Sequence, residues 1–341
     1  AALLLKKQGY DVTGVTMQIW PLEKERGKTC CGLDAVNDAR SVAWMLDIPH
    51  YVMNLRNEFE NAVVDYFCQE YLKGRTPNPC IACNRYIKFE IFLNRALAMG
   101  ADYIATGHYA RIKYNQDGHK FELLKAREPG KDQSYALYGM TQAQLQRTLF
   151  PLGDLSKKEV RELARQVDLV VAEKAESQEI CFVESGDYAR FVEEHGGRGT
   201  GDGPIVDSSG RFLGTHRGLH HYTIGQRKGL GIALGIPLYV KELQVETNTV
   251  VVGNNFELYK NSLLADDVIY ISGQEPKEAV KVGVKVRYAA QTVPALLNPT
   301  GDGQAKIDFD SPQRALTPGQ AVVFYQDQSV LGGGTIDRVL N

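Results

Sequence analysis

Hydrophobic residues in the first half of the chain follow two patterns that alternate along the sequence. Apolar residues three or four apart predict amphipathic helices, and this pattern occurs in residues 1–8, 34–46, 57–73, 87–99 and 141–167. Between these segments, β-branched and aromatic residues predict strands, at residues 11–20, 50–55 and 102–110. Strands that alternate with helices predict a parallel sheet with right-handed crossover connections, and therefore an α/β fold.

The pattern changes after residue 195, where glycine-rich and turn-rich sequence replaces the long helical periods. Short alternating runs separated by turn residues predict strands there, at residues 238–240, 245–252, 268–271, 281–289, 304–309 and 320–325. Such a series predicts one or two small β-barrels. An earlier alternating segment, residues 111–128, turns at Asp117-Gly118 and predicts a hairpin.

Composition narrows the class of protein. A chain of 341 residues is too long for one ordinary core, so two or three domains are expected. Its 43% hydrophobic and 23% charged residues are typical of a globular protein, and no apolar run approaches the roughly 20 residues of a membrane span. We therefore expect a cytoplasmic protein with no membrane partner. The net charge of −2 neither favours nor excludes nucleic acid, since a local basic face is enough to bind phosphates.

The richest chemistry lies in residues 76–89, which read TPNPCIACNRYIKF. We expect the two prolines to stiffen a loop that holds Cys80 and Cys83 just ahead of a helix starting near Tyr86. Amide groups at a helix N-terminus favour a thiolate, as a nucleophile or a metal ligand requires. The alternative is a structural turn with two buried thiols. Six cysteines are too sparse for a secreted disulfide framework.

Other candidates are weaker on local sequence alone. Met17 and the pair Gly107-His108 fall near the ends of predicted parallel strands, where ligands bind in such sheets. The segment Lys131-Asp132-Gln133 reads most simply as a solvated turn, and Cys181 as a buried core thiol. The basic segment 215–230 suits either a phosphate backbone or an ordinary surface loop.

Five motifs in one order point to a known family. TPNPCIACNRYIKF, GADYIATGHYAR, KDQSYAL, SQEICF and YTIGQRKGLGI resemble the bacterial tRNA-specific 2-thiouridylases, and the resemblance runs through nearly the whole chain. It implies a pyrophosphatase-loop α/β domain, of the adenine nucleotide α-hydrolase type, at residues 1–186. A small β-rich central domain at residues 187–262 and a C-terminal β-barrel at residues 263–341 would follow.

The resemblance also implies an activity. Such enzymes use ATP with Mg²⁺ to adenylate the 2-carbonyl of the wobble uridine in tRNA, and then replace that oxygen with sulfur from a cysteine persulfide. A partner protein, either a persulfide relay or a cysteine desulfurase, supplies the sulfur. Cys83 matches the nucleophile, Cys181 matches the persulfide-bearing cysteine, and the two would pair as a transient disulfide during turnover.

Further positions carry over by motif. Met17 and Gly107 match positions that line the ATP pocket. The positions that match tRNA contacts include three next to the target base, Asn78, Pro79 and Cys80, and seven others, His108, Lys131, Asp132, Gln133, Arg287, Tyr288 and Gln320.

Two departures from the family pattern are visible. The glycine-rich phosphate loop of the form SGGVDSS, which would precede the first helix, is absent, so upstream residues are expected to be missing and residues 1–341 alone are expected not to adenylate. Cys80 stands where many relatives carry Asp, and it creates a C-x-x-C pair.

Two alternatives stay open at this point. Cys80, Cys83 and Cys181 would suffice to hold a [4Fe–4S] cluster that carries the sulfide. Alternatively, the chain is a non-catalytic RNA-binding module with a structural zinc at the C-x-x-C pair, for which His216 and His220 are the one histidine pair at ligand spacing.

Overall fold

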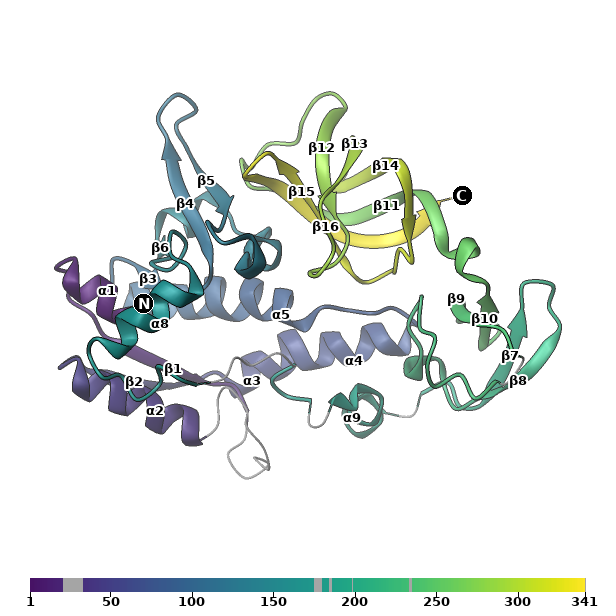
Figure 1. The fold of residues 1–341 in the computed structure, drawn as a ribbon, viewed down its shortest axis with the longest axis horizontal. Coiled ribbons are helices and arrows are strands. Elements are labelled where there is room, and N and C mark those ends of the chain that lie inside the picture. The colour runs from purple at the N-terminus through teal and green to yellow at the C-terminus, as the bar shows by residue number, and fades with distance from the viewer. Residues whose placement is uncertain (21–32, 175–179, 184–185, 198, 233–234, 341) are drawn as a thin grey trace. The chain divides into compact units, whose positions relative to one another are not determined.

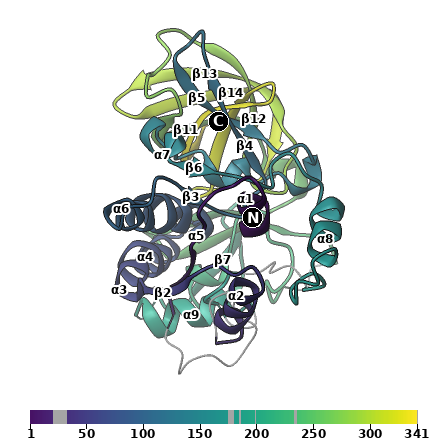
Figure 2. The ribbon, with the colours of Figure 1, turned by 90° about the vertical axis from the view of Figure 1, so that its left-hand side faces the viewer.

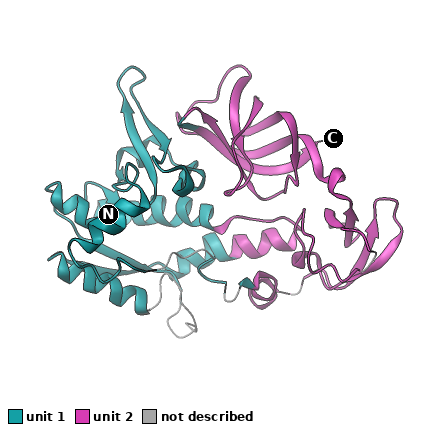
Figure 3. Ribbon diagram, in the orientation of Figure 1, with its two compact units in different colours: residues 1–64, 80–186, 328–330 teal, residues 65–79, 187–327, 331–341 magenta. Residues whose placement is uncertain are grey.

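The computed structural model describes residues 1–20, 33–174, 180–183, 186–197, 199–232 and 235–340. Contacts within the chain divide it into two compact units (Figure 3). Unit 1 comprises Ala1–Val64, Cys80–Gly186 and Gln328–Val330. Unit 2 comprises Asp65–Pro79, Asp187–Asp327 and Leu331–Asn341. Among the described residues, no helix is both long enough and apolar enough to cross a membrane.

Unit 1 contains the predicted parallel strands. Strand β1 (Gly14–Gln18) pairs in parallel with β2 (His50–Asn54), and α2 (Leu33–Met45) lies between them in sequence (Figure 1). A second parallel pair joins β3 (Ile104–Ala105) to β6 (Thr148–Leu149). The predicted α/β class with parallel pairing is therefore confirmed. The third predicted strand is shorter than expected, since only two residues of 102–110 pair before the chain enters the hairpin.

A long helical segment supports these strands. It runs without a break through α5 (Pro79–Ala82), the π-helix η3 (Cys83–Phe92) and α6 (Leu93–Ala98). Ile87 and Phe89 of η3 are fully buried, and η3 packs against α3 (Arg56–Phe59) and the π-helix η2 (Glu60–Val64). π-Helical turns are rare and recur at functional sites.

The rest of unit 1 follows the predicted order, except that Thr148–Leu149, within the segment 141–167 predicted as helical, form strand β6. Strands β4 (Ala110–Asn115) and β5 (Lys120–Lys125) form the expected hairpin around Asp117-Gly118. Leu4 of α1 (Ala2–Lys7) and Val160 of α8 (Lys157–Arg165) both pack against one small cluster, Tyr109, Ala126 and Leu152. Figure 2 shows these two helices beside each other at the N-terminal end of the unit. The remaining elements are η4 (Pro129–Lys131), η5 (Ser134–Leu137) and α7 (Gln142–Gln146).

The first part of unit 2 combines two helices with a small sheet. Helices α4 (Asp65–Leu72) and α9 (Tyr188–His195) pack through aromatic rings, with Tyr71 stacked on Tyr188 at 4.8 Å. The sheet has the order β8-β7-β10-β9 and contains β7 (Gly203–Asp207), β8 (Phe212–His216), β9 (Tyr239–Gln244) and β10 (Thr249–Gly253). The 3₁₀-helix η7 (Leu219–His221) buries Leu219 in its core.

The second part of unit 2 is the predicted β-barrel. After η8 (Asn255–Leu258), six strands pair in the order β11-β14-β13-β12-β15-β16, and β16 pairs back onto β11. Their bounds are Tyr259–Tyr270, Val280–Lys285, Val293–Gly301, Gln304–Arg314, Ala321–Gln326 and Ser329–Leu340 for β11 to β16. Alternate side chains fill the interior, including Leu263, Val284, Leu297, Ile307, Val322, Phe324 and Ile336.

Strand β16 was not expected from the sequence, because glycines in its centre lower strand propensity. The structure explains these glycines. A methyl group at Gly332 would collide with the carbonyl of Ile269, and one at Gly334 would lie 2.8 Å from the carbonyl oxygen of Asp266. Strand β11 therefore approaches too closely for any side chain at these two positions. Strands β7 and β8 were missed for a similar reason, since they lie in glycine-rich sequence.

Candidate active site

The helix that carries Cys80 and Cys83 begins at Pro79, not near Tyr86 as predicted. Proline suits the first helical position because its fixed φ is helical and its missing N–H has no partner there anyway. Pro79 therefore starts the helix and does not prolong a loop. Cys80 lies in the first turn and is exposed, whereas Cys83 lies one turn later and is half-buried. Three residues apart on a helix, the two cysteines share a face.

A buried amide fixes the turn that follows Cys83. Asn84 is 3% exposed, and its Nδ2 donates to the carbonyl of Ala136 in η5 at 3.0 Å. Its Oδ1 accepts a hydrogen bond from Nζ of Lys88 at 2.9 Å. Both functions of the amide are used, so the start of η3 is held against η5 and a cation is held one turn beyond. Sequence reasoning missed both residues, although an Asn and a Lys four apart in an apolar helix were a usable signal.

Cys181 lies in a turn, not in a strand-like segment, and is half-buried. The next residue, Phe182, is 4% exposed. Its ring packs against Phe59 of α3 at 5.5 Å and against Trp20 at 6.0 Å. Phe182 therefore anchors the Cys181 turn against α3, the helix on which η3 also packs. Residues 175–179, which contain the Ser-Gln of the motif, lie outside the described residues.

His108 is held in an apolar setting. Its ring packs against Phe89 and Phe150, with ring centroids 5.9 Å away in each case, and the two phenylalanine rings contact each other at the same distance. Nδ1 of His108 is 2.8 Å from Oγ1 of Thr106. Burial lowers the pKa of His108 to about 3, and the nearby charge of Lys88 adds to this effect. The ring is therefore neutral near pH 7 and acts only through hydrogen bonds.

The loop at residues 131–133 is not a solvated turn. The carboxylate of Asp132 is 8% exposed and accepts hydrogen bonds from the amides of Ala126 and Ser134 and from the Ser134 hydroxyl, at 2.9–3.1 Å. The side-chain oxygen of Gln133 accepts a hydrogen bond from the backbone N–H of Tyr109, and the backbone N–H of Gln133 donates to the carbonyl of Tyr109. Asp132 and Gln133 therefore shape the loop, and Lys131 is its cationic residue.

The two predicted nucleotide-pocket residues lie at strand ends. Met17 is in β1, paired with Met53 of β2, and Gly107 follows β3 by two residues. Gly107 is exposed, and a methyl group there would only touch Leu152 at 3.7 Å. Packing therefore does not require glycine at position 107.

In unit 2, Gln320 binds the segment that leads to Asn78 and Pro79. Its Nε2 donates to the carbonyl of Thr76 at 2.8 Å, and the amide of Thr76 donates to the carbonyl of Pro318 at 2.9 Å. A methyl group at Gly319 would lie 2.8 Å from the Thr76 amide nitrogen. Gln320 was predicted to contact tRNA. In the structure its side chain forms the hydrogen bond that positions Thr76.

Arg287 and Tyr288 lie just after β12 and are both exposed. The guanidinium of Arg287 donates to the carbonyl of Arg314 at 2.6 Å, and Nζ of Lys285 lies 5.7 Å from the centre of the Tyr288 ring. A fixed cation beside an accessible aromatic ring suits contact with RNA.

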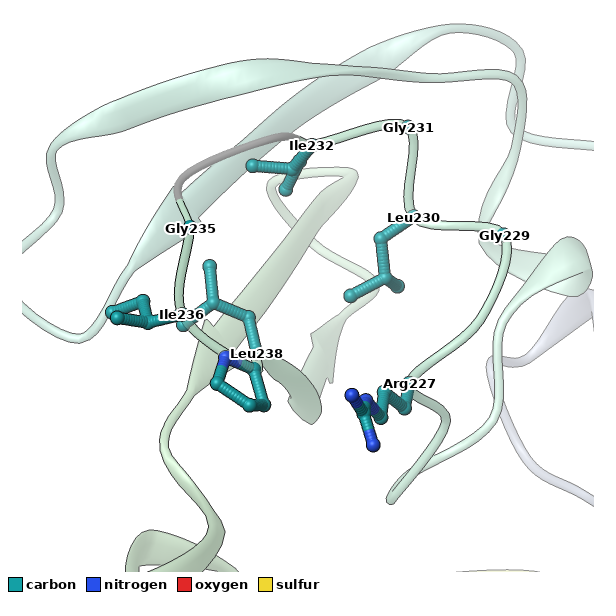
Figure 4. A pocket seen from close by; sticks show the side chains of 9 residues that line it. Arg227, Gly229, Leu230, Gly231, Ile232, Gly235, Ile236 and Leu238 are labelled. Carbon is teal, nitrogen blue, oxygen red and sulfur yellow. The ribbon is translucent and has the colours of Figure 1, made fainter.

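The basic segment ends at a hollow of about 460 Å³ (Figure 4). Arg227 is its cationic side chain, and the apolar part of the wall includes Leu230, Ile232, Ile236, Pro237 and Leu238. The hollow therefore combines one positive charge with apolar surface inside unit 2.

The described residues give the zinc alternative no support at the C-x-x-C pair. Among these residues, Glu193, His220 and His221 form a group of three metal-binding side chains whose ligand atoms lie within 4.8 Å of one another. This group contains no cysteine. His216 does not join His220 in that group, since both of its ring nitrogens have backbone partners, Gly218 and Asn248.

Comparison with known proteins identifies the family. Residues 1–185 match a family model described as the tRNA methyl transferase HUP domain, residues 189–254 its PRC-barrel domain, and residues 260–336 an aminomethyltransferase beta-barrel domain. The tRNA-specific 2-thiouridylase MnmA of Moorella thermoacetica is 54% identical, over 99% of this chain and 96% of the relative. The protein of the same name from Acetivibrio thermocellus is 52% identical, over 98% of this chain and 95% of the relative. The chain thus belongs to the MnmA family of tRNA-specific 2-thiouridylases.

Proposed function

We propose that this protein replaces the 2-oxygen of the wobble uridine in tRNA with sulfur, in a reaction that consumes ATP. The observation that carries the proposal is that Cys83 and Cys181 lie on segments of unit 1 that both pack on α3. Cys83 lies on η3, which packs on α3, and Cys181 precedes Phe182, whose ring packs on Phe59 of α3. The names of the relatives support tRNA as the substrate.

Activation comes first because a carbonyl oxygen is a poor leaving group. The 2-oxygen attacks the α-phosphorus of ATP, pyrophosphate leaves, and the oxygen becomes part of an AMP leaving group. Mg²⁺ would neutralise the phosphates during this step. Met17 and Gly107, at the carboxyl ends of β1 and β3, are the residues that we assign to the nucleotide pocket.

Sulfur transfer then uses the two cysteines. The terminal sulfur of a persulfide on Cys181 attacks C2, and AMP leaves with the electron pair of the C–O bond. The Cys83 thiolate attacks Sγ of Cys181, and the S–S bond to the transferred sulfur breaks. Its electron pair stays on that sulfur, which leaves a 2-thio base and a Cys83–Cys181 disulfide. An external thiol reductant restores both cysteines. Cys80 has no step in this scheme.

The tRNA contributes the anticodon base, which we expect to leave the stack and enter the site. Asn78, Pro79 and Cys80 are the residues that we assign to that base. Lys131 would meet the phosphate backbone from a loop shaped by Asp132 and Gln133. The partner that loads the persulfide would be a relay protein or a cysteine desulfurase, and the reaction would take place in the cytoplasm.

The test measures 2-thiouridine by mass spectrometry after the complete protein reacts with tRNA, ATP, Mg²⁺ and a persulfide donor. Cys83→Ser and Cys181→Ser are expected to lose thiolation while tRNA binding is retained, because each removes one sulfur from the relay. The buried control Cys68→Ser is expected to keep thiolation. Full thiolation by either of the first two variants would rule out this scheme. Loss of activity in Cys80→Ser, together with iron in anaerobically purified protein, would instead favour the [4Fe–4S] mechanism.

A further inference from the structure

Three metal-binding side chains meet in unit 2, away from the cysteines. Glu193 comes from α9, and His220 and His221 come from η7. The Nε2 atoms of His220 and His221 lie 3.2 and 3.1 Å from the same carboxylate oxygen, Oε1 of Glu193. The two imidazole rings are 4.4 Å apart between centroids. Two imidazoles and one carboxylate therefore point their ligand atoms at one small volume.

The two nitrogen–oxygen separations match those of a zinc centre. With bonds of about 2.0–2.1 Å and tetrahedral angles, neighbouring ligand atoms on zinc lie about 3.3 Å apart. Two histidines and one glutamate, with the fourth position open, form a recurrent three-ligand zinc set. His221 and Glu193 are partly exposed, with side-chain exposures of 32% and 47%, so water can reach the fourth position.

The central ligand is rigidly placed. His220 is 3% exposed, and its ring lies so close to Gly199 and Gly218 that a methyl group on either glycine would clash with it. Gly218 also has φ +135°, which side chains rarely adopt. Among the described residues, Nδ1 of His220 is buried without a hydrogen-bond partner. The polar contacts of His220 therefore depend on Nε2.

We propose that Glu193, His220 and His221 bind one zinc ion, with water as the fourth ligand. The ion joins η7 to α9, which are already in contact where the Tyr188 hydroxyl donates to the carbonyl of His221 at 3.3 Å. Zinc-bound histidines normally donate their second N–H to an acceptor, and Nδ1 of His220 has none among the described residues. We therefore expect weaker binding than at a closed four-ligand site.

Cobalt(II) titration of the complete protein tests this proposal, with zinc competition and metal analysis. Wild type is expected to bind one more equivalent of cobalt(II) than Glu193→Gln and His221→Asn. The additional cobalt(II) should show the visible absorption bands of a tetrahedral site with nitrogen and oxygen ligands. Cysteine-bound cobalt is recognised separately by its intense near-ultraviolet charge-transfer band. His119→Asn, an exposed histidine in a unit 1 turn, is the matched control and should bind like wild type.

A second measurement covers variants that fold poorly. Zinc is expected to raise the melting temperature of wild type and His119→Asn, and not that of Glu193→Gln, because only an intact site gains stability from metal. Equal stoichiometry in wild type and Glu193→Gln, with no zinc-dependent stabilisation of either, would show that the cluster is a hydrogen-bonded trio and overturn the proposal. Neither result depends on the thiolation activity.

Discussion

At the scale of single residues, burial decides which groups are reactive near neutral pH. His108 is kept neutral by burial against two aromatic rings. Cys68 is kept protonated inside unit 2, where burial raises the pKa of its thiol to about 11 and Asp65 adds to the effect. Cys80, by contrast, is exposed in the first turn of its helix, where solvent reaches it.

The depressed pKa of His108 predicts a loss of stability in acid. Between pH 6.5 and about 3 the unfolded chain binds a proton at this residue that the folded chain does not, so stability falls as the pH falls through that window. One proton limits the slope to about 1.4 kcal/mol per pH unit. Denaturant unfolding from pH 7 to pH 4 should therefore show a flatter profile for His108→Gln than for wild type. His119→Asn serves as control, and parallel profiles for wild type and His108→Gln would contradict the prediction.

The thiols should also differ in reactivity. At pH 8, iodoacetamide is expected to modify Cys80 rapidly and Cys68 many times more slowly, because alkylation requires the thiolate and access to solvent. Peptide mapping by mass spectrometry on native protein measures both rates. Denatured protein, in which the two rates should converge, is the control. Equal rates in the native state would mean that Cys68 is not protected.

At the scale of elements, close approaches of backbone determine several glycines. Gly332 and Gly334 allow β11 to lie against β16, and Gly319 allows the β-barrel to contact Thr76. Gln320 then adds a hydrogen bond to the same residue. These contacts position the peptide that leads into the cysteine-bearing helix.

Gly319→Ala tests this element, and Gly273→Ala is its matched control. Both glycines have a left-handed φ, +90° and +74°, so each substitution costs about 1–2 kcal/mol of backbone strain. Only at Gly319 would the new methyl group also press on Thr76, since nothing lies within 4 Å of it at Gly273. Denaturant unfolding should show a clearly larger loss for Gly319→Ala. Similar losses would mean that the close approach at Thr76 relaxes freely.

At the scale of the whole molecule, the sequence was enough to predict the parallel α/β class, the hairpin and the β-barrel, because each has a strong local pattern. It misplaced the helix start at Pro79, since proline both ends and begins helices. It missed β16, whose glycines are explained only by a neighbouring strand some 65 residues earlier in the chain. It also missed the cluster of Glu193 with His220 and His221, which tertiary packing alone assembles.

The charge of the whole molecule bears on tRNA binding. With a net charge of −2, any affinity for phosphates must come from local cations, and we propose Arg287 as one of them. Arg287→Gln is expected to weaken tRNA binding several-fold and to reduce its salt dependence by about one ion, because one phosphate contact is lost. Lys281→Gln is the control, because Lys281 is an exposed cation of β12, the strand that precedes Arg287. Filter binding at several salt concentrations gives both quantities, and equal salt slopes for the two variants would argue against a phosphate contact at Arg287.

The contacts of Thr76 with Pro318 and Gln320 span more than two hundred residues of sequence. During synthesis on the ribosome, residues 74–78 emerge long before their partners exist. A polypeptide that terminates early would therefore reach the cell without the support for this peptide.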